Sequence, residues 1–214
     1  PRYSKKEIEE HVMRTVIRML LDREWISTSS YETILTQYKN ESESDTWEQV
    51  LIIDKSYIQK KDITENVGIL FHPHKLHTSI NNSTSILKFT KNKELGRKIM
   101  IVKEIKGNIY TKDIMKVDGL ELFLTTEVMH PIIDYEYQPK FEPYLTDTQE
   151  QEILENYQLD KLDLPHMYVS DPVSRYYDLK LGQIVKIIRP SITAVNSHYY
   201  RRVVPGNIEP MFAK

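Results

Sequence analysis

Apolar residues recur at helical spacing near the start of this chain. Between residues 5 and 23 they return every three or four positions, which predicts an amphipathic helix. Ser4 and Glu7 precede this pattern with the spacing of a capping box, in which a hydroxyl and a carboxylate satisfy free N–H groups of the first turn. Ser29 and Glu32 repeat that spacing and predict a second, shorter helix.

Strand patterns follow these helices. Short continuous apolar runs at residues 50–53, 68–71 and 99–102 predict strands that are buried on both faces. Residues 119–124 alternate between apolar and polar positions and predict one more strand.

The second half of the chain has different signals. Thr146 opens a predicted helix, and Asp171 followed by Pro172 predicts another, with an N-cap acid and proline at the first helical position. Strands are predicted at residues 184–189 and 197–204.

These patterns predict an α+β protein of two domains. Residues 1–118 are expected to form an α/β domain around a small sheet. Residues 119–214 are expected to form a small α+β domain with a short mixed or antiparallel sheet.

The composition excludes several kinds of protein and functional site. The 214 residues include no cysteine, which excludes a disulfide scaffold, a thiolate metal site and a cysteine nucleophile. No run of about 18 apolar residues occurs, so no membrane span is expected. No glycine-rich phosphate loop is found among the six glycines.

The net charge of −2 hides a strong alternation along the chain. Residues 88–116 carry nine basic and three acidic residues, a net of +6. Residues 120–170 carry two basic and eleven acidic residues (net −9), and residues 171–204 carry six basic and two acidic residues (net +4). Such alternation favours partner surfaces of different sign over a general affinity for polyanions.

Residues 164–191 carry a specific resemblance. The matching stretches are Leu164-Pro165-His166-Met167, Ser170-Asp171-Pro172-Val173-Ser174-Arg175-Tyr176-Tyr177 and Leu179-Lys180-Leu181-Gly182-Gln183-Ile184-Val185-Lys186-Ile187-Ile188-Arg189-Pro190-Ser191. They resemble the C-terminal signature of the fifth subunit shared by the eukaryotic nuclear RNA polymerases, a signature that is similar to the small archaeal counterpart of that subunit. The resemblance covers roughly residues 120–204, and the first half follows the eukaryotic or viral members only in its order of elements.

Several positions depart from the family pattern. Asp178 stands where glycine is usual, Leu181 where a basic residue is usual, and Val195 near another expected glycine. Aspartate enters the left-handed backbone region more easily than most residues, so we expect the turn at Asp178 to be kept.

The resemblance implies a non-catalytic subunit without a cofactor, a metal or a small-molecule substrate. It implies an N-terminal jaw domain, with a fold similar to restriction endonucleases, beside downstream double-stranded DNA. It also implies a C-terminal assembly domain that docks on the largest polymerase subunit, among other polymerase subunits. The expected location is the nucleus for a cellular protein, and a cytoplasmic viral factory or the virion for a viral one.

Two sets of site residues follow. By position in the family, the jaw loop that reaches DNA contains Asn108, Tyr110, Thr111 and Lys112. The predicted subunit interface is the set Asp171, Pro172, Arg175, Tyr176, Lys186, Arg189, Tyr199 and Arg201, since arginine and tyrosine together are typical interface anchors. The alternatives for the basic members of this set are nucleic-acid binding and ion pairing with the acidic segment 134–163 of the same chain.

Two other functions compete with this one. Glu104-Ile105-Lys106 after a predicted strand matches half of a metal-dependent nuclease site, in which the carboxylate binds a divalent ion. A free-standing DNA-binding transcription regulator is the other, although the overall charge disfavours tight binding to DNA. His72, His74 and His77 suggest a metal site less strongly than they suggest a solvated loop.

Overall fold

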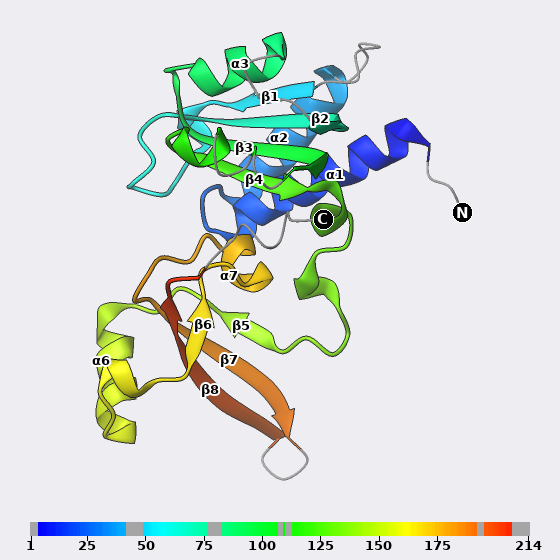
Figure 1. The fold of residues 1–214 in the computed structure, drawn as a ribbon. Coiled ribbons are helices and arrows are strands. Elements are labelled where there is room, and N and C mark those ends of the chain that lie inside the picture. Colours follow the sequence, from blue (N-terminus) through cyan, green and yellow to red (C-terminus); the bar gives the residue numbers. More distant parts are fainter. Residues whose placement is uncertain are drawn as a thin grey trace. The chain divides into compact units, whose positions relative to one another are not determined.

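The computed structural model describes residues 4–41, 49–76, 83–106, 109, 113–191 and 195–206. The chain divides into two compact units, one ending at His130 and the other beginning at Pro131 (Figure 1). None of the described helices is long and apolar enough to span a membrane.

Two helices begin the first unit. Helix α1 (Lys5–Asp22) starts at the predicted capping box: the Glu7 N–H donates to Ser4 Oγ, and the Ser4 N–H donates to the Glu7 carboxylate. Helix α2 (Thr28–Glu41) starts earlier than predicted, because Ser27 Oγ accepts the Ser30 N–H at 3.0 Å. The predicted capping box at Ser29 is therefore wrong.

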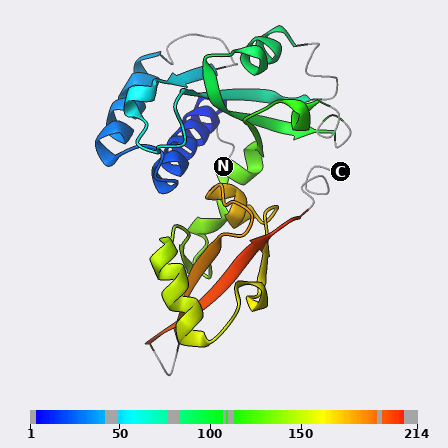
Figure 2. The ribbon, with the colours of Figure 1, turned by 90° about the vertical axis from the view of Figure 1, so that its left-hand side faces the viewer.

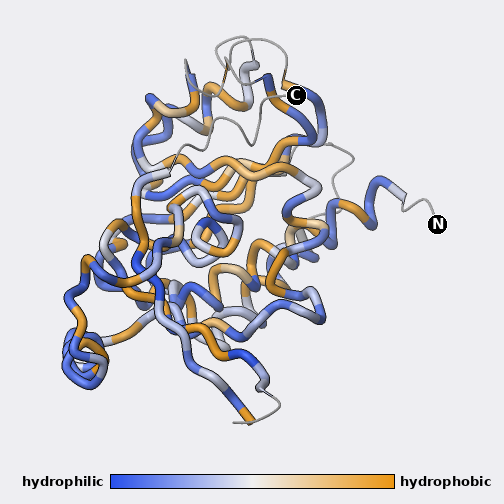
Figure 3. The backbone as a smooth tube through the Cα atoms, turned by 60° about the horizontal axis from the view of Figure 1, so that its bottom comes forward, coloured by the Kyte–Doolittle hydropathy of each residue, from blue (hydrophilic) through white to orange (hydrophobic). Residues whose placement is uncertain are grey.

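The first sheet has the strand order β1-β2-β3-β4. Its strands are β1 (Gln49–Ile53), β2 (Asn66–Leu76), β3 (Leu95–Ile105) and β4 (Leu120–Leu124), and only β1 runs antiparallel to its neighbour. The central strands β2 and β3 each contain a short apolar run, residues 69–71 and 99–102, in which every side chain is buried; Figure 3 shows the hydropathy along the backbone. Helices α1 and α2 lie on one side of the sheet and α3 (Thr84–Lys91), which the sequence did not predict, lies on the other (Figure 2).

Two strand predictions need correction. Strand β1 is at the edge of the sheet and is buried on one face only, since Val50 and Ile52 are exposed while Leu51 and Ile53 are buried. The histidine-rich segment was expected to be a solvated loop. Its residues up to Leu76 instead belong to β2, whose register with β3 shifts after His72.

The predicted domain boundary at 118/119 also differs from the structure. Strand β4 pairs with β3, with Met100 opposite Leu122, and therefore completes the first sheet. Helix α5 (Thr125–Met129) packs against α1 in the same unit. The division between the units thus falls after α5, because hydrogen bonding to β3 decides to which sheet the alternating segment belongs.

The second unit has a four-stranded mixed sheet of order β5-β7-β8-β6. The predicted strands are β7 (Ile184–Ser191) and β8 (Val195–Val204), which form a hairpin; β5 (Lys140–Glu142) and β6 (His166–Tyr168) were not predicted. The helices α6 (Asp147–Tyr157) and α7 (Pro172–Tyr176) both begin where the sequence predicts. Short 3₁₀ turns lie at Lys55–Tyr57, Ile114–Lys116, Ile132–Asp134 and Lys161–Asp163.

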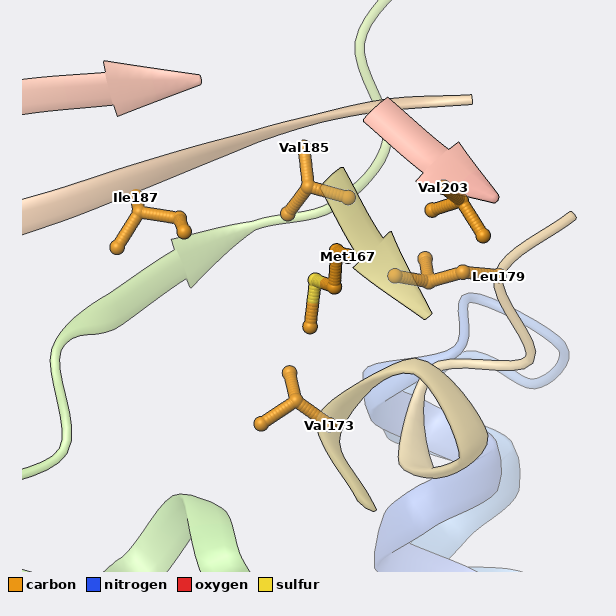
Figure 4. Close-up of a cluster of buried hydrophobic side chains, with 6 residues drawn as sticks. All are labelled: Met167, Val173, Leu179, Val185, Ile187 and Val203. Atoms are coloured by element: carbon orange, nitrogen blue, oxygen red, sulfur yellow. The ribbon is translucent and has the colours of Figure 1, made fainter. Parts of the chain in front are cut away.

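One small core holds α7 against this sheet. Side chains from β6, β7, β8, α7 and the turn after α7 converge in it, as Figure 4 shows. Its buried members are Met167, Val173, Leu179, Val185, Ile187 and Val203.

Candidate subunit interface

Helix α7 and the turn after it are built by local capping. The Asp171 carboxylate accepts the Val173 N–H at 2.8 Å, and Pro172 occupies the first turn. Asp178 then takes a left-handed backbone (φ 50°), as predicted for the position where the family usually has glycine. The family turn is therefore kept without its glycine.

The hairpin brings three predicted interface residues together on one face of the sheet. Ile187 lies opposite Tyr199, and Val185 lies opposite Arg201. Since alternate residues of a strand share a face, Arg189, Tyr199 and Arg201 continue the face that carries the buried Val185 and Ile187. We call these three residues the Arg–Tyr face.

The Arg–Tyr face presents two positively charged side chains and one aromatic ring. The Arg189 guanidinium carbon lies 5.1 Å from the Tyr199 ring centroid, a cation–π arrangement that holds both side chains in place. Tyr199 is nevertheless 49% exposed, and an Arg201 amino group lies 3.5 Å from the His166 carbonyl oxygen. Two arginines and a half-exposed aromatic ring on one face of the sheet suit a partner with carboxylates and an apolar contact.

Lys186 belongs to the opposite face and is already paired. Its ammonium nitrogen lies 2.8 Å from a Glu142 carboxylate oxygen, and Lys186 stands opposite Tyr200 in the hairpin. The hydrogen bond from Lys186 lowers the pKa of Glu142 despite some desolvation, and the same bond raises the pKa of Lys186. For Lys186 the alternative interpretation, pairing with the acidic segment of this chain, is confirmed.

The α7 members of the predicted set differ in accessibility. Tyr176 is buried, and its ring packs edge-on against Tyr177 with centroids 5.1 Å apart. Pro172 is exposed, whereas Arg175 and Asp171 are half-buried. Tyr176 therefore supports α7 from within, and the other three residues reach the surface.

Two polar residues that the sequence did not single out connect the segment before α6 to the turns around α7. The Tyr144 hydroxyl donates to the Tyr177 carbonyl oxygen at 2.6 Å, and the Gln183 amide donates to the Pro143 carbonyl oxygen at 2.7 Å. These contacts join residues more than thirty positions apart, so no local pattern could have indicated them.

The predicted DNA-contacting residues Asn108, Tyr110, Thr111 and Lys112 lie outside the described residues. The described residues around them are the end of β3, where the Lys106 N–H bonds the Leu76 carbonyl oxygen, and the turn Ile114–Lys116. Lys103, Lys106 and Lys116 are exposed there.

The nuclease half-motif has a different role in the structure. The Glu104 carboxylate forms an ion pair with Lys75, its register partner on β2. Among the described residues no group of three or more histidine, aspartate or glutamate side chains could hold a metal ion.

The capped α7 helix, the hairpin and the small core define a known class of domain. The family description "RNA polymerase Rpb5, C-terminal domain" matches residues 130–203, which is almost the whole of the second unit. A subunit of DNA-directed RNA polymerases I, II and III, RPABC1 of Caenorhabditis elegans, is 30% identical over 207 residues, covering 90% of this chain and 94% of the relative. The chain belongs to the RNA polymerase Rpb5 family.

Viral and archaeal proteins share the similarity. DNA-directed RNA polymerase subunit 5 of Acanthamoeba polyphaga mimivirus is 32% identical and covers 59% of this chain and 60% of the viral protein. Subunit Rpo5 of Methanosarcina acetivorans is 36% identical over 73 residues, which make up 34% of this chain and 92% of the archaeal protein.

Proposed function

We propose that this chain is a non-catalytic structural subunit of a DNA-directed RNA polymerase. The observation that carries the proposal is the match of the second unit to the Rpb5 C-terminal domain. In this proposal the second unit is the assembly domain and docks on the largest polymerase subunit. Phosphodiester chemistry and its magnesium then belong to other chains.

We place the docking contact on the Arg–Tyr face and the neighbouring surface of α7. Arg189 and Tyr199 are accessible, and their cation–π contact fixes both side chains. Arg175 and Pro172 on α7 also reach the surface. Lys186 is left out, because Glu142 already neutralises it on the other face of the sheet.

In the same proposal the first unit is the jaw beside downstream double-stranded DNA, with the restriction-endonuclease-like fold of the family. Its basic stretch 88–116 has a net charge of +6, and the exposed Lys103, Lys106 and Lys116 flank the predicted loop in the sequence. Attraction of lysines to phosphates is independent of sequence and weakens with salt. Since the whole chain has a net charge of −2, it should contact DNA only where the large subunits hold DNA nearby. We accordingly expect it in the nucleus of a cell, or in the viral factory or virion of a virus.

The test is to purify the tagged full-length chain from the cells that produce it and to identify the proteins that copurify with it. We expect the two largest polymerase subunits in stoichiometric amount, and Arg189→Glu should reduce their recovery. Lys140→Glu is the matched control, because it reverses an exposed charge on the opposite face of the same sheet. Recovery of neither large subunit would contradict the proposed function, and equal recovery with both variants would exclude the Arg–Tyr face as the docking site.

A further inference from the structure

The second unit has a second exposed surface, on the side of the sheet that carries Lys186. Helix α6 lies on that side: its Glu150 accepts the Ile184 N–H at 3.2 Å, and Tyr157 packs edge-on against Tyr200 with ring centroids 5.6 Å apart. No residue of α6 is buried. The helix is eleven residues long and half-buries only Glu150, Ile153 and Leu154, so its stability depends on its caps and on what covers it.

Both ends of α6 are capped. Thr146 and Gln149 form the predicted capping box at the start. At the other end Gln158 has a left-handed backbone, and the Leu159 N–H bonds the Leu154 carbonyl oxygen at 3.1 Å, which is a Schellman motif. The chain then turns directly into the 3₁₀ turn Lys161–Asp163.

This compact end presents apolar side chains to solvent. Tyr157 is 55% exposed, Leu159 41% and Leu162 73%. Three large exposed apolar side chains thus lie within six residues of the chain, and grouped exposure of this kind marks an interaction site more often than a single exposed residue does. We call Tyr157, Leu159 and Leu162 the α6 patch.

The rim of the α6 patch is acidic. Residues 147–163 contain six acidic residues and one lysine, a net charge of −5. Glu152, Glu155, Asp160 and Asp163 are exposed, while the single lysine, Lys161, pairs with Glu150. Such a rim repels nucleic acid phosphates and attracts lysine and arginine side chains.

We propose that the α6 patch is a second protein-docking surface, which binds a segment of another polypeptide that combines apolar side chains with lysine or arginine. The apolar side chains of that segment cover Tyr157, Leu159 and Leu162, and its cations pair with the acidic rim. This surface is separate from the Arg–Tyr face, whose positive charge calls for a partner of the opposite sign. One subunit therefore offers two surfaces of different charge.

Site-specific photo-cross-linking in the full-length chain tests this proposal. The photoreactive residue p-benzoylphenylalanine replaces Leu162 in one variant and Tyr137 in the control. Tyr137 is 93% exposed in a turn that the Gln138 N–H closes onto the Tyr135 carbonyl oxygen, in the same acidic half of the chain. The cross-linked complexes are purified through a tag, and the partner peptide is mapped by mass spectrometry.

We expect residue 162, but not residue 137, to cross-link to a peptide of another polypeptide with more lysine and arginine than aspartate and glutamate. The double substitution Glu152→Lys/Glu155→Lys keeps good helix formers and should lower the yield by about threefold or more. Cross-links within the chain, to a second copy or to an acidic peptide would overturn the proposal, as would an unchanged yield in the double variant. The two proposals fail separately: loss of the large subunits contradicts the first, and their recovery without a residue 162 cross-link contradicts this one.

Discussion

A buried cluster of charges in the first unit provides the sharpest stability prediction. The guanidinium of Arg23, at the end of α1, donates two hydrogen bonds to the Glu121 carboxylate on β4, at 3.2 and 2.8 Å. Arg97 on β3 donates to the same carboxylate at 2.8 Å. Both guanidinium carbons lie about 5 Å from the centroid of the buried Trp25 ring. One carboxylate thus connects α1, β3 and β4.

We expect Glu121→Gln to lower the free energy of unfolding of the first unit by about 3 kcal/mol, since removing one partner of a buried ion pair costs about 3–5 kcal/mol. Arg23 is fully buried and would lose its counterion, which favours a large effect. Glu121 is 20% exposed and glutamine keeps one oxygen acceptor, which favours the lower end of the range.

Urea unfolding followed by tryptophan fluorescence measures this difference. Trp25 and Trp47 both precede residue 131, so the signal reports the first unit. Glu104→Gln is the matched control, because its ion pair with Lys75 is exposed and should contribute less than about 1 kcal/mol. A loss below about 1 kcal/mol for Glu121→Gln would refute the argument.

The same ion pair should make the stability of the first unit depend on pH. Burial raises the pKa of Glu121, but the guanidinium groups of Arg23 and Arg97 outweigh it and hold the pKa below the usual 4.5. A carboxyl with a depressed pKa in the folded state stabilises the protein above its unfolded pKa and loses this contribution as the pH falls through the folded pKa. The stability difference between the wild type and Glu121→Gln should therefore be complete at pH 7 and shrink below about pH 4.5. A difference that stays constant into acid would contradict the ion-pair origin.

Three further predictions concern single positions. Asp171→Ala should destabilise the second unit by about 1 kcal/mol in thermal unfolding, because the Val173 N–H loses its cap, whereas Asp171→Asn should stay close to wild type. Val195→Gly should raise stability by about 1 kcal/mol, since a β-branched residue at φ 59° is strained and glycine is not; a loss of stability would argue against this strain. Lys112→Glu should leave polymerase assembly intact and lower the salt tolerance of the downstream-DNA contact, and an unaltered salt dependence would remove this loop from the DNA path.

Sequence reasoning succeeded where structure is local. The helix starts at Ser4, Thr146 and Asp171 were predicted correctly, because a cap joins residues two or three positions apart. The left-handed backbone at Asp178 was predicted from the glycine usual at this position in the family and from the ease with which aspartate enters that region. The strands of the hairpin were also recognisable from their apolar and aromatic residues.

The predictions failed where the structure depends on pairing between segments that are distant in the sequence. An apolar run such as residues 50–53 looks the same in an edge strand and in a central strand, and only the pairing with β2 made it an edge. The segment at 119–124 was assigned to the wrong unit because nothing in its own residues shows that it pairs with β3. Strands β5 and β6, with three residues each, are too short for a periodic pattern.

The family, the capped helices and the distribution of charge along the chain can all be recognised from residues that are close together in the sequence. Which charges remain accessible to a partner depends instead on how distant segments fold together. Lys186 and Arg189 are three residues apart on one strand, yet one pairs with Glu142 and the other stacks on Tyr199. Strand pairing and the alternation of side chains across a sheet place them on opposite faces, and no count of charges along the chain contains that information.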